Sequence, residues 1–149
     1  MIVTFCGHSS FQACQVDENK VLDILEENVG CAPVEFYLGG YGNFDSFAYS
    51  CCKKFKEAHP QATLVFVTPY ITEEYQKNHL SYLKMDYDCI IYPAIEDKPL
   101  RFAIAYRNKH MAESADLVIA YVKHSSGGAY KMLKHAQRLK RKIINLANC

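Results

Sequence analysis

Short, continuous apolar runs alternate along this chain with longer segments whose apolar residues recur at helical spacing. Strands without polar alternation are covered on both faces, which requires helices on each side of the sheet. Regular alternation of strand and helix independently favours a parallel sheet. The expected strands cover residues 2–6, 34–38, 63–68, 89–92, 116–122 and 143–146. The expected helices cover 17–29, 43 or 45 to 58, 72–84 (irregular), 100–114 and 127–140.

These elements predict an α/β fold, a Rossmann-like three-layer sandwich with a mostly parallel sheet of five to six strands flanked by helices. The length of 149 residues favours a single domain spanning 1–149. In a sheet of this kind, ligands bind beyond the carboxyl ends of the strands, at the point where the strand order reverses.

Composition narrows the class of protein further. Hydrophobic residues make up 50% of the chain and charged residues 22%, which excludes a disordered tail. No apolar run approaches the roughly 18 residues that cross a bilayer, and the first residues lack the pattern of a signal peptide. We therefore expect a cytoplasmic protein that does not associate with membranes.

The seven cysteines are an odd number and show no paired CxxC spacing of a zinc site, so no metal is expected. Cys6 and Cys89 lie in apolar runs, whereas Cys51 and Cys52 lie on an expected helix. We expect reduced, buried thiols.

The charges nearly cancel, with 17 basic and 16 acidic side chains and a net charge of +1. A domain-wide electrostatic attraction to nucleic acid is therefore not expected. A run of basic residues near the last expected helix has two interpretations. A solvated face that complements the helix dipole is the favoured interpretation, and a nucleic-acid surface is the alternative. The run comprises Lys131, Lys134, His135, Arg138, Lys140, Arg141 and Lys142.

Three polar, mostly glycine-bearing loops follow expected strands, at residues 6–10, 39–45 and 124–128. All three should lie at one edge of a parallel sheet, and two lead directly into helices. Free N–H groups and the helix dipole favour an anion there, and glycine lets the backbone approach a phosphate. The chain has neither the GxxxxGK[ST] sequence of an ATPase P-loop nor the GxGxxG spacing of a standard NAD dehydrogenase.

Four segments resemble the SLOG superfamily, a Rossmann-like group related to the LOG proteins and the DprA core, and within it the YpsA/YoqJ-like branch of small domains. Residues 4–8 (TFCGH) are similar to its "TGHR" element, and 39–48 (GGYGNFDSFA) to "GGAxGxDxxA". Residues 107–120 are similar to "RNxxMvdxaDxliA", and 125–129 (SSGGA) to the "SGGT" loop. Ser9 stands where "TGHR" has arginine, and the last loop lacks the proline, threonine and glutamate of the LOG "PGGxGTxxE" loop.

The resemblance implies a pocket for a nucleotide or nucleotide-derived ligand, of the NAD, ADP-ribose or nucleoside phosphate type, and a homodimer. Some members of the superfamily cut N-glycosidic bonds and others only bind. The binding residues implied are Gly7, His8, Gly39, Gly40, Gly42, Asp45, Arg107, Asn108, Ser125, Ser126, Gly127 and Gly128.

Several of these side chains also have ordinary structural interpretations. Asp45 is either a charge at a helix N-terminus or a group that binds ribose or acts as nucleophile or base. Arg107 is either a solvated helix residue or a phosphate ligand, and His8 is either a turn residue or a ligand contact. Ser125 and Ser126 are expected to cap the last helix.

The first functional hypothesis is a binding module for a nucleotide-type small molecule, with no cofactor of its own. The second is an N-glycosidase or deoxyribosyltransferase in which Asp45, or less favourably Glu113, acts at the anomeric carbon of the sugar. The missing loop glutamate favours binding over catalysis. The third hypothesis, binding of single-stranded DNA, depends on the basic last helix alone.

Overall fold

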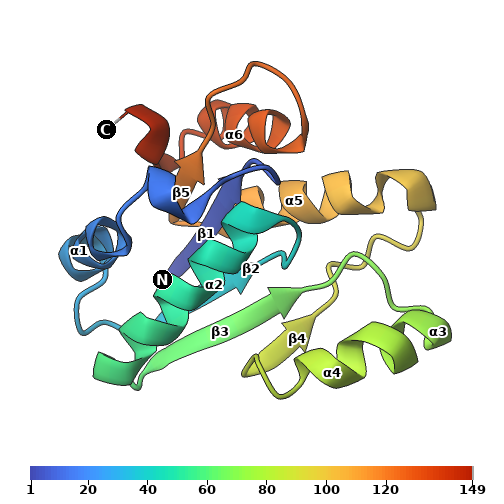
Figure 1. The fold of residues 1–149 in the computed structure, drawn as a ribbon. Coiled ribbons are helices and arrows are strands. Elements are labelled where there is room, and N and C mark those ends of the chain that lie inside the picture. Colours follow the sequence, from blue (N-terminus) through green and yellow to red (C-terminus); the bar gives the residue numbers. More distant parts are fainter. Residues whose placement is uncertain (149) are drawn as a thin grey trace.

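A six-stranded parallel sheet forms the centre of the molecule in the computed structural model, which describes residues 1–148 (Figure 1). The strand order is β4-β3-β2-β1-β5-β6, and all five pairings are parallel. This confirms the predicted Rossmann-like α/β fold. The strands are β1 (Ile2–Gly7), β2 (Val34–Leu38), β3 (Ala62–Val67), β4 (Cys89–Ile91), β5 (Leu117–Tyr121) and β6 (Lys142–Asn145).

Two helical layers cover the sheet. The longer helices are α1 (Glu18–Asn28), α2 (Asn43–Ala58), α5 (Ala103–Ser114) and α6 (Gly128–Arg138). Short 3₁₀ turns are η1 (Ala13–Gln15), η3 (Leu100–Phe102) and η4 (Leu146–Asn148). The central strands bury both faces, as the unbroken apolar runs predict. In β5, Leu117 and Ile119 pack in the cluster that includes α1 and α2, and Val118 and Ala120 pack in the cluster that includes α5 and α6.

The irregular helix expected near 72–84 consists of three short pieces: α3 (Glu73–Tyr75), a π-helical turn (η2, Gln76–Leu80) and α4 (Ser81–Leu83). Leu80 is the one fully buried side chain in this segment. The segment therefore lies on the surface of the molecule and contributes little to the core.

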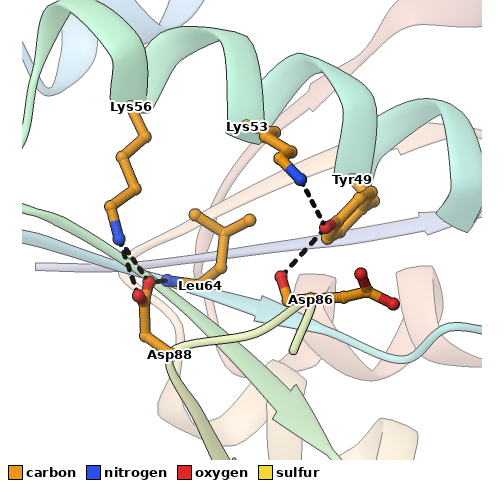
Figure 2. A network of polar contacts seen from close by, with 6 residues as sticks. All are labelled: Tyr49, Lys53, Lys56, Leu64, Asp86 and Asp88. Carbon is orange, nitrogen blue, oxygen red and sulfur yellow. Dashed lines mark hydrogen bonds and ion pairs between the residues drawn. The ribbon is translucent and has the colours of Figure 1, made fainter. Parts of the chain in front are cut away.

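A polar network fixes the chain after α4 to α2 and β3 (Figure 2). Both carboxylate oxygens of Asp88 accept hydrogen bonds from Lys56 Nζ at 2.7 Å, and one also accepts the N–H of Leu64 at 2.7 Å. The Tyr49 hydroxyl donates to the Asp86 carbonyl at 2.9 Å. Partial burial acts to raise the pKa of Asp88, but these hydrogen bonds outweigh it and hold the pKa below its usual value. The network holds the residues after α4 against α2.

The strand order reverses between β1 and β5, because β2, β3 and β4 lie on one side of β1 whereas β5 and β6 lie on the other. The loops that leave β1 and β5 therefore diverge at the carboxyl edge of the sheet. This is the topological switch point where ligands of such folds bind.

Phe102 is 45% exposed, because it ends the 3₁₀ turn before α5 and lies outside the buried face of that helix. The expectation of buried thiols was wrong for Cys14, Cys31 and Cys89, which are exposed. Cys89 is exposed because it begins β4, the edge strand, which no further strand covers. Cys6, Cys51 and Cys52 are buried as expected. In the described part of the chain, no helix has the length and apolar character needed to cross a bilayer.

Candidate functional site

A cavity of about 240 Å³ opens at the carboxyl edge of the sheet, at the switch point. Its walls come from the end of β1 and the loop after it, the start of α2, one face of α5 and the start of α6. Seven of the predicted site residues line it: Gly7, His8, Asp45, Arg107, Asn108, Gly127 and Gly128. Residues separated by about 120 positions in sequence thus meet at one place.

Arg107 lies on α5 with its side chain buried to 2% exposure beneath this cavity. Its Nη1 donates to the Gly39 carbonyl at 2.9 Å, directly after β2, and to the Val67 carbonyl at 2.8 Å, at the end of β3. Its Nε donates to Asn108 Oδ1 at 2.9 Å. Nη2 has no hydrogen-bond acceptor among residues 1–148. The guanidinium therefore joins two strand ends and keeps one donor group free.

Asp45 lies in the first turn of α2, where it lines the same cavity. One carboxylate oxygen, Oδ2, accepts the N–H of Tyr41 at 2.9 Å, and the other makes no hydrogen bond within residues 1–148. Burial raises the pKa of Asp45 to about 6, although the Tyr41 N–H and the Arg107 charge act to lower it. The carboxyl group can thus exchange a proton near neutral pH and retains one free acceptor.

The N-terminus of α6 is open toward the cavity. Its N-cap is Gly127, at φ 92° and ψ 176°, and no side chain caps the helix. The first backbone bond into the helix runs from Lys131 N–H to the Gly127 carbonyl, so the N–H groups before it remain available. The predicted caps Ser125 and Ser126 were wrong: both are exposed in the loop after β5 and do not line the cavity.

The N-terminus of α2 has the same backbone geometry but is closed. Its N-cap Gly42 has φ 89° and ψ 176°, again without a side-chain cap. Here, however, the Asn43 N–H donates to the Ser9 carbonyl at 3.1 Å. A β-carbon on Gly42 would lie 2.7 Å from Ser9 Cα, so the loop after β1 covers this helix end. In the described residues the start of α6 has no such cover, so of the two glycine-led helix starts it is the more open to an anion.

His8 connects the two loops at the switch point. Its Nε2 accepts the N–H groups of Lys123 at 2.9 Å and His124 at 3.3 Å, which requires a neutral ring with the proton on Nδ1. Desolvation, together with the nearby His124 and Lys123, lowers the pKa of His8 and stabilises that neutral form. His8 lines the cavity, and its hydrogen bonds hold the loops after β1 and β5 together.

The remaining predicted glycines occupy supporting positions. Gly7 lines the cavity, yet a β-carbon there would overlap the ring of Phe44, so close packing alone requires glycine. Gly39 is buried and offers its carbonyl to Arg107 instead of lining the cavity. Gly40 lines a neighbouring cavity.

Glu113, the alternative carboxylate, lies at the far end of α5. Its side chain pairs with His135 at 3.3 Å, and its carbonyl accepts Arg141 Nη2 at 2.7 Å. It does not line the cavity, so the structure does not support Glu113 as the group that acts there.

Two further cavities border this site, and sequence reasoning did not find them. One, of about 570 Å³, lies between α2 and the 73–83 segment and shares Asp45 with the first cavity. The other is a groove of about 510 Å³ between α5 and α6, which shares Ile104, Asn108, Gly128 and Met132 with it. The cluster of tyrosines at 70–87 is the feature of the sequence that indicates the cavity between α2 and the 73–83 segment.

No family model and no curated protein matches this sequence. Solved structures do match. DNA processing protein A (DprA) from Helicobacter pylori, in a study of its single-stranded DNA binding, aligns with a TM-score of 0.63 and 16% identity over 96% of this chain. DprA from Streptococcus pneumoniae aligns with a TM-score of 0.62 and 14% identity over 95% of this chain.

The chain has a DprA-like fold. It spans 63% of the Helicobacter chain and 48% of the Streptococcus chain, so it corresponds to only part of each DprA protein. Identities of this size show the fold and no more. The agreement supports the Rossmann-like architecture that the SLOG resemblance implies, whereas the narrower YpsA/YoqJ-like resemblance stays a prediction.

Proposed function

We propose that this chain binds a nucleotide or nucleotide-derived small molecule at the switch-point cavity. The phosphate lies at the N-terminus of α6, and a sugar hydroxyl donates to the free oxygen of Asp45. The observation that carries the proposal is the meeting of an uncapped helix N-terminus with the unpartnered Nη2 of a buried arginine in one cavity. Both features favour negative charge, and burial strengthens their effect.

The cavity walls support this placement. No β-carbon contact within 4 Å would arise at Gly127 or Gly128, so a ligand can approach the backbone there. The side chains of Met111 and Met132 supply apolar surface, and Asn108 supplies a polar group. Among the described residues, Asp45 is the one carboxylate in the lining, and it is partly protonated near neutral pH because its pKa is about 6.

Substitution of Gly128 tests the phosphate site without attacking the core. Gly128→Asp places a negative charge at the first helical position, which favours the helix but repels a phosphate. We expect Gly128→Asp to keep or raise the melting temperature and to abolish binding of ribonucleoside 5′-monophosphates and ribose 5-phosphate, measured by calorimetry. The matched control Gly128→Ala keeps the free N–H groups and should bind. Equal affinities of the two variants would contradict the proposal.

The enzymatic alternative depends on Asp45. A carboxyl group with a pKa of about 6 can donate a proton to a leaving base or accept one from water. Glycosidases usually need two carboxyl groups about 5–10 Å apart, and the described lining holds one. Binding without turnover is therefore the better-supported function. Release of a base from a nucleoside monophosphate by the wild type, lost in Asp45→Ala, would restore the enzymatic alternative.

Single-stranded DNA is the second candidate ligand, because the basic groove between α5 and α6 continues the cavity. The groove contains no carboxylate in its described lining, and its basic members are Arg101, Lys109, Lys131, His135 and Arg138. DprA from Helicobacter pylori, a protein of the same fold, binds single-stranded DNA. A strand held here would follow the groove with its phosphates and enter the cavity at α6.

Oligothymidylate binding measured against salt concentration tests this candidate. The logarithm of the affinity should fall linearly with the logarithm of salt concentration, and Lys131→Ala should reduce the slope by about 1. Lys20→Ala, on α1 in the opposite helical layer, is the control of equal charge and should leave the slope unchanged. Absence of binding even at low salt would exclude the candidate.

A further inference from the structure

We infer that the cavity between α2 and the 73–83 segment is the binding site for the base of the same nucleotide. This inference rests on the proposed function, because it places the base relative to a phosphate at α6. The switch-point cavity, at about 240 Å³, lies below the roughly 300–1,000 Å³ of ordinary small-molecule sites. It suits a phosphate and sugar and leaves the base to be accommodated next to it.

Aromatic rings are the commonest side chains in the lining of the neighbouring cavity. Phe66 is buried at its floor, and Tyr87 packs on Phe66 and on Tyr49, with ring centroids 5.3 and 5.1 Å apart. Tyr75 and His79 stack on each other at 4.7 Å and belong to the lining from the 73–83 segment. A planar heteroaromatic base stacks on such rings.

Polar groups in this lining are free to contact the edge of a base. The side chains of Ser50 and Asn78 make no hydrogen bond within residues 1–148. Asn78 belongs to the π-helical turn, a backbone form that recurs at functional sites. Tyr82 lines the same cavity and is 74% exposed, which is unusual for an aromatic side chain. Stacking surface and unpaired donors and acceptors are what recognition of a base requires.

Asp45 joins the two cavities, since it belongs to the lining of both. Its free oxygen is therefore at the place where a sugar would link a phosphate at α6 to a base over Phe66. The basic groove is the less suitable place for the base, because its charged side chains would attract further phosphates instead. A nucleoside monophosphate thus extends from α6, past Asp45, to the aromatic cavity.

The test compares the four ribonucleoside 5′-monophosphates with ribose 5-phosphate on the full chain by calorimetry. Wild type should bind at least one monophosphate about tenfold or more tightly than ribose 5-phosphate, as base stacking on aromatic rings predicts. Ser50 is exposed on α2, so Ser50→Trp should fill the cavity without disturbing the core. We expect this variant to lose the preference for the monophosphate while its affinity for ribose 5-phosphate stays the same. Ser50→Ala, the matched control, should keep the preference.

Tyr82→Ala provides a second variant that cannot unfold the core, because the ring is exposed, and it should reduce the preference several-fold. The inference is overturned if wild type shows no preference for any monophosphate, or if Ser50→Trp and Tyr82→Ala both retain it. In the latter case, loss of binding in Gly128→Asp would leave the proposed phosphate site standing. Conversely, if Gly128→Asp binds normally but Ser50→Trp does not, the base site stands and the phosphate site fails.

Discussion

Asp45 and Arg107 are charged side chains held beside an interior that apolar residues otherwise fill. Their environments oppose the charged form of each: burial raises the pKa of Asp45 to about 6 and lowers the pKa of Arg107, while each attracts the charge of the other. The fold retains them although their burial is unfavourable. At the scale of single residues, the unfavourable burial of these two charges indicates the candidate site more clearly than any sequence motif does.

Asp45 should make the stability of the protein depend on pH in an unusual direction. Its pKa is higher in the folded chain than its ordinary value of 3.8, so the folded state holds a proton that the unfolded state releases. Stability from this group is therefore present below about pH 4 and is lost as the pH rises through 6. We expect Asp45→Asn to gain stability relative to wild type between pH 4.5 and pH 7.5, measured by urea unfolding. A stability difference that does not change with pH would contradict this.

Arg107 should contribute to stability as well as to binding. Arg107→Ala leaves the buried carbonyls of Gly39 and Val67 without their donor, and we expect a loss of about 2–4 kcal/mol in the free energy of unfolding. Arg107→Lys cannot reproduce the two-carbonyl bridge together with the Asn108 contact, so it should also lose stability. Because lysine keeps a charged donor, this loss should be smaller than that of Arg107→Ala. Denaturant unfolding of both variants measures this, and an unchanged midpoint for Arg107→Ala would refute the bridging role.

At the scale of elements, α2 and α6 begin with the same glycine conformation and differ in what covers them. The loop after β1 covers the start of α2 and accepts the N–H of Asn43, whereas nothing within the described residues covers the start of α6. Three glycine loops at one sheet edge therefore do not make three equivalent anion sites. The contact between Ser9 and the start of α2 distinguishes the two helix starts. The spacing of residues in the sequence does not reveal this contact.

Gly127 and Gly128 should respond oppositely to alanine. Gly127 has φ 92° and ψ 176°, a conformation nearly restricted to glycine, so Gly127→Ala should lose about 1–3 kcal/mol of stability. Gly128 has no positive φ and no neighbour in the way, so Gly128→Ala should be neutral or gain up to about 1 kcal/mol. Thermal unfolding of the pair checks this, and equal effects would show that the α6 start is not held as described.

At the scale of the whole molecule, the buried sheet should protect some thiols and leave others reactive. Burial raises the pKa of Cys6 and Cys51 to about 12 and raises that of Cys52 as well. Iodoacetamide labelling of the native protein, read by peptide mass spectrometry, should modify Cys14 and Cys31 and spare those three. Labelling after unfolding is the control and should modify all five. Native labelling of Cys51 or Cys52 would mean that the α2 layer opens.

The homodimer expected from the SLOG resemblance stays a prediction. A cavity of about 240 Å³ at the edge of the sheet is shallow for a complete ligand, and either the aromatic cavity or a second subunit could extend it. Sedimentation velocity with and without a bound monophosphate distinguishes these possibilities, because only the second requires association.

The sequence by itself determined the class of the fold and the edge of the sheet at which the candidate site lies. Unbroken apolar runs such as 117–121 require cover on both faces, and the alternation with helices leaves few topologies. These signals are local, because periodicity and burial act within a few residues. For the same reason the irregular helix near 72–84 and the start of α2 were predictable.

Only the tertiary structure decided which predicted residues meet and which do not. Arg107 reaches the carbonyl of Gly39 across 68 positions, Ser9 covers the α2 terminus, and Ser125 and Ser126 do not cap the helix they were expected to cap. The aromatic cavity likewise depends on a π-helical turn and on a loop fixed to α2 by Lys56 and Asp88 (Figure 2). Such contacts join segments far apart in sequence, and their geometry follows from packing the whole chain, which no local pattern records.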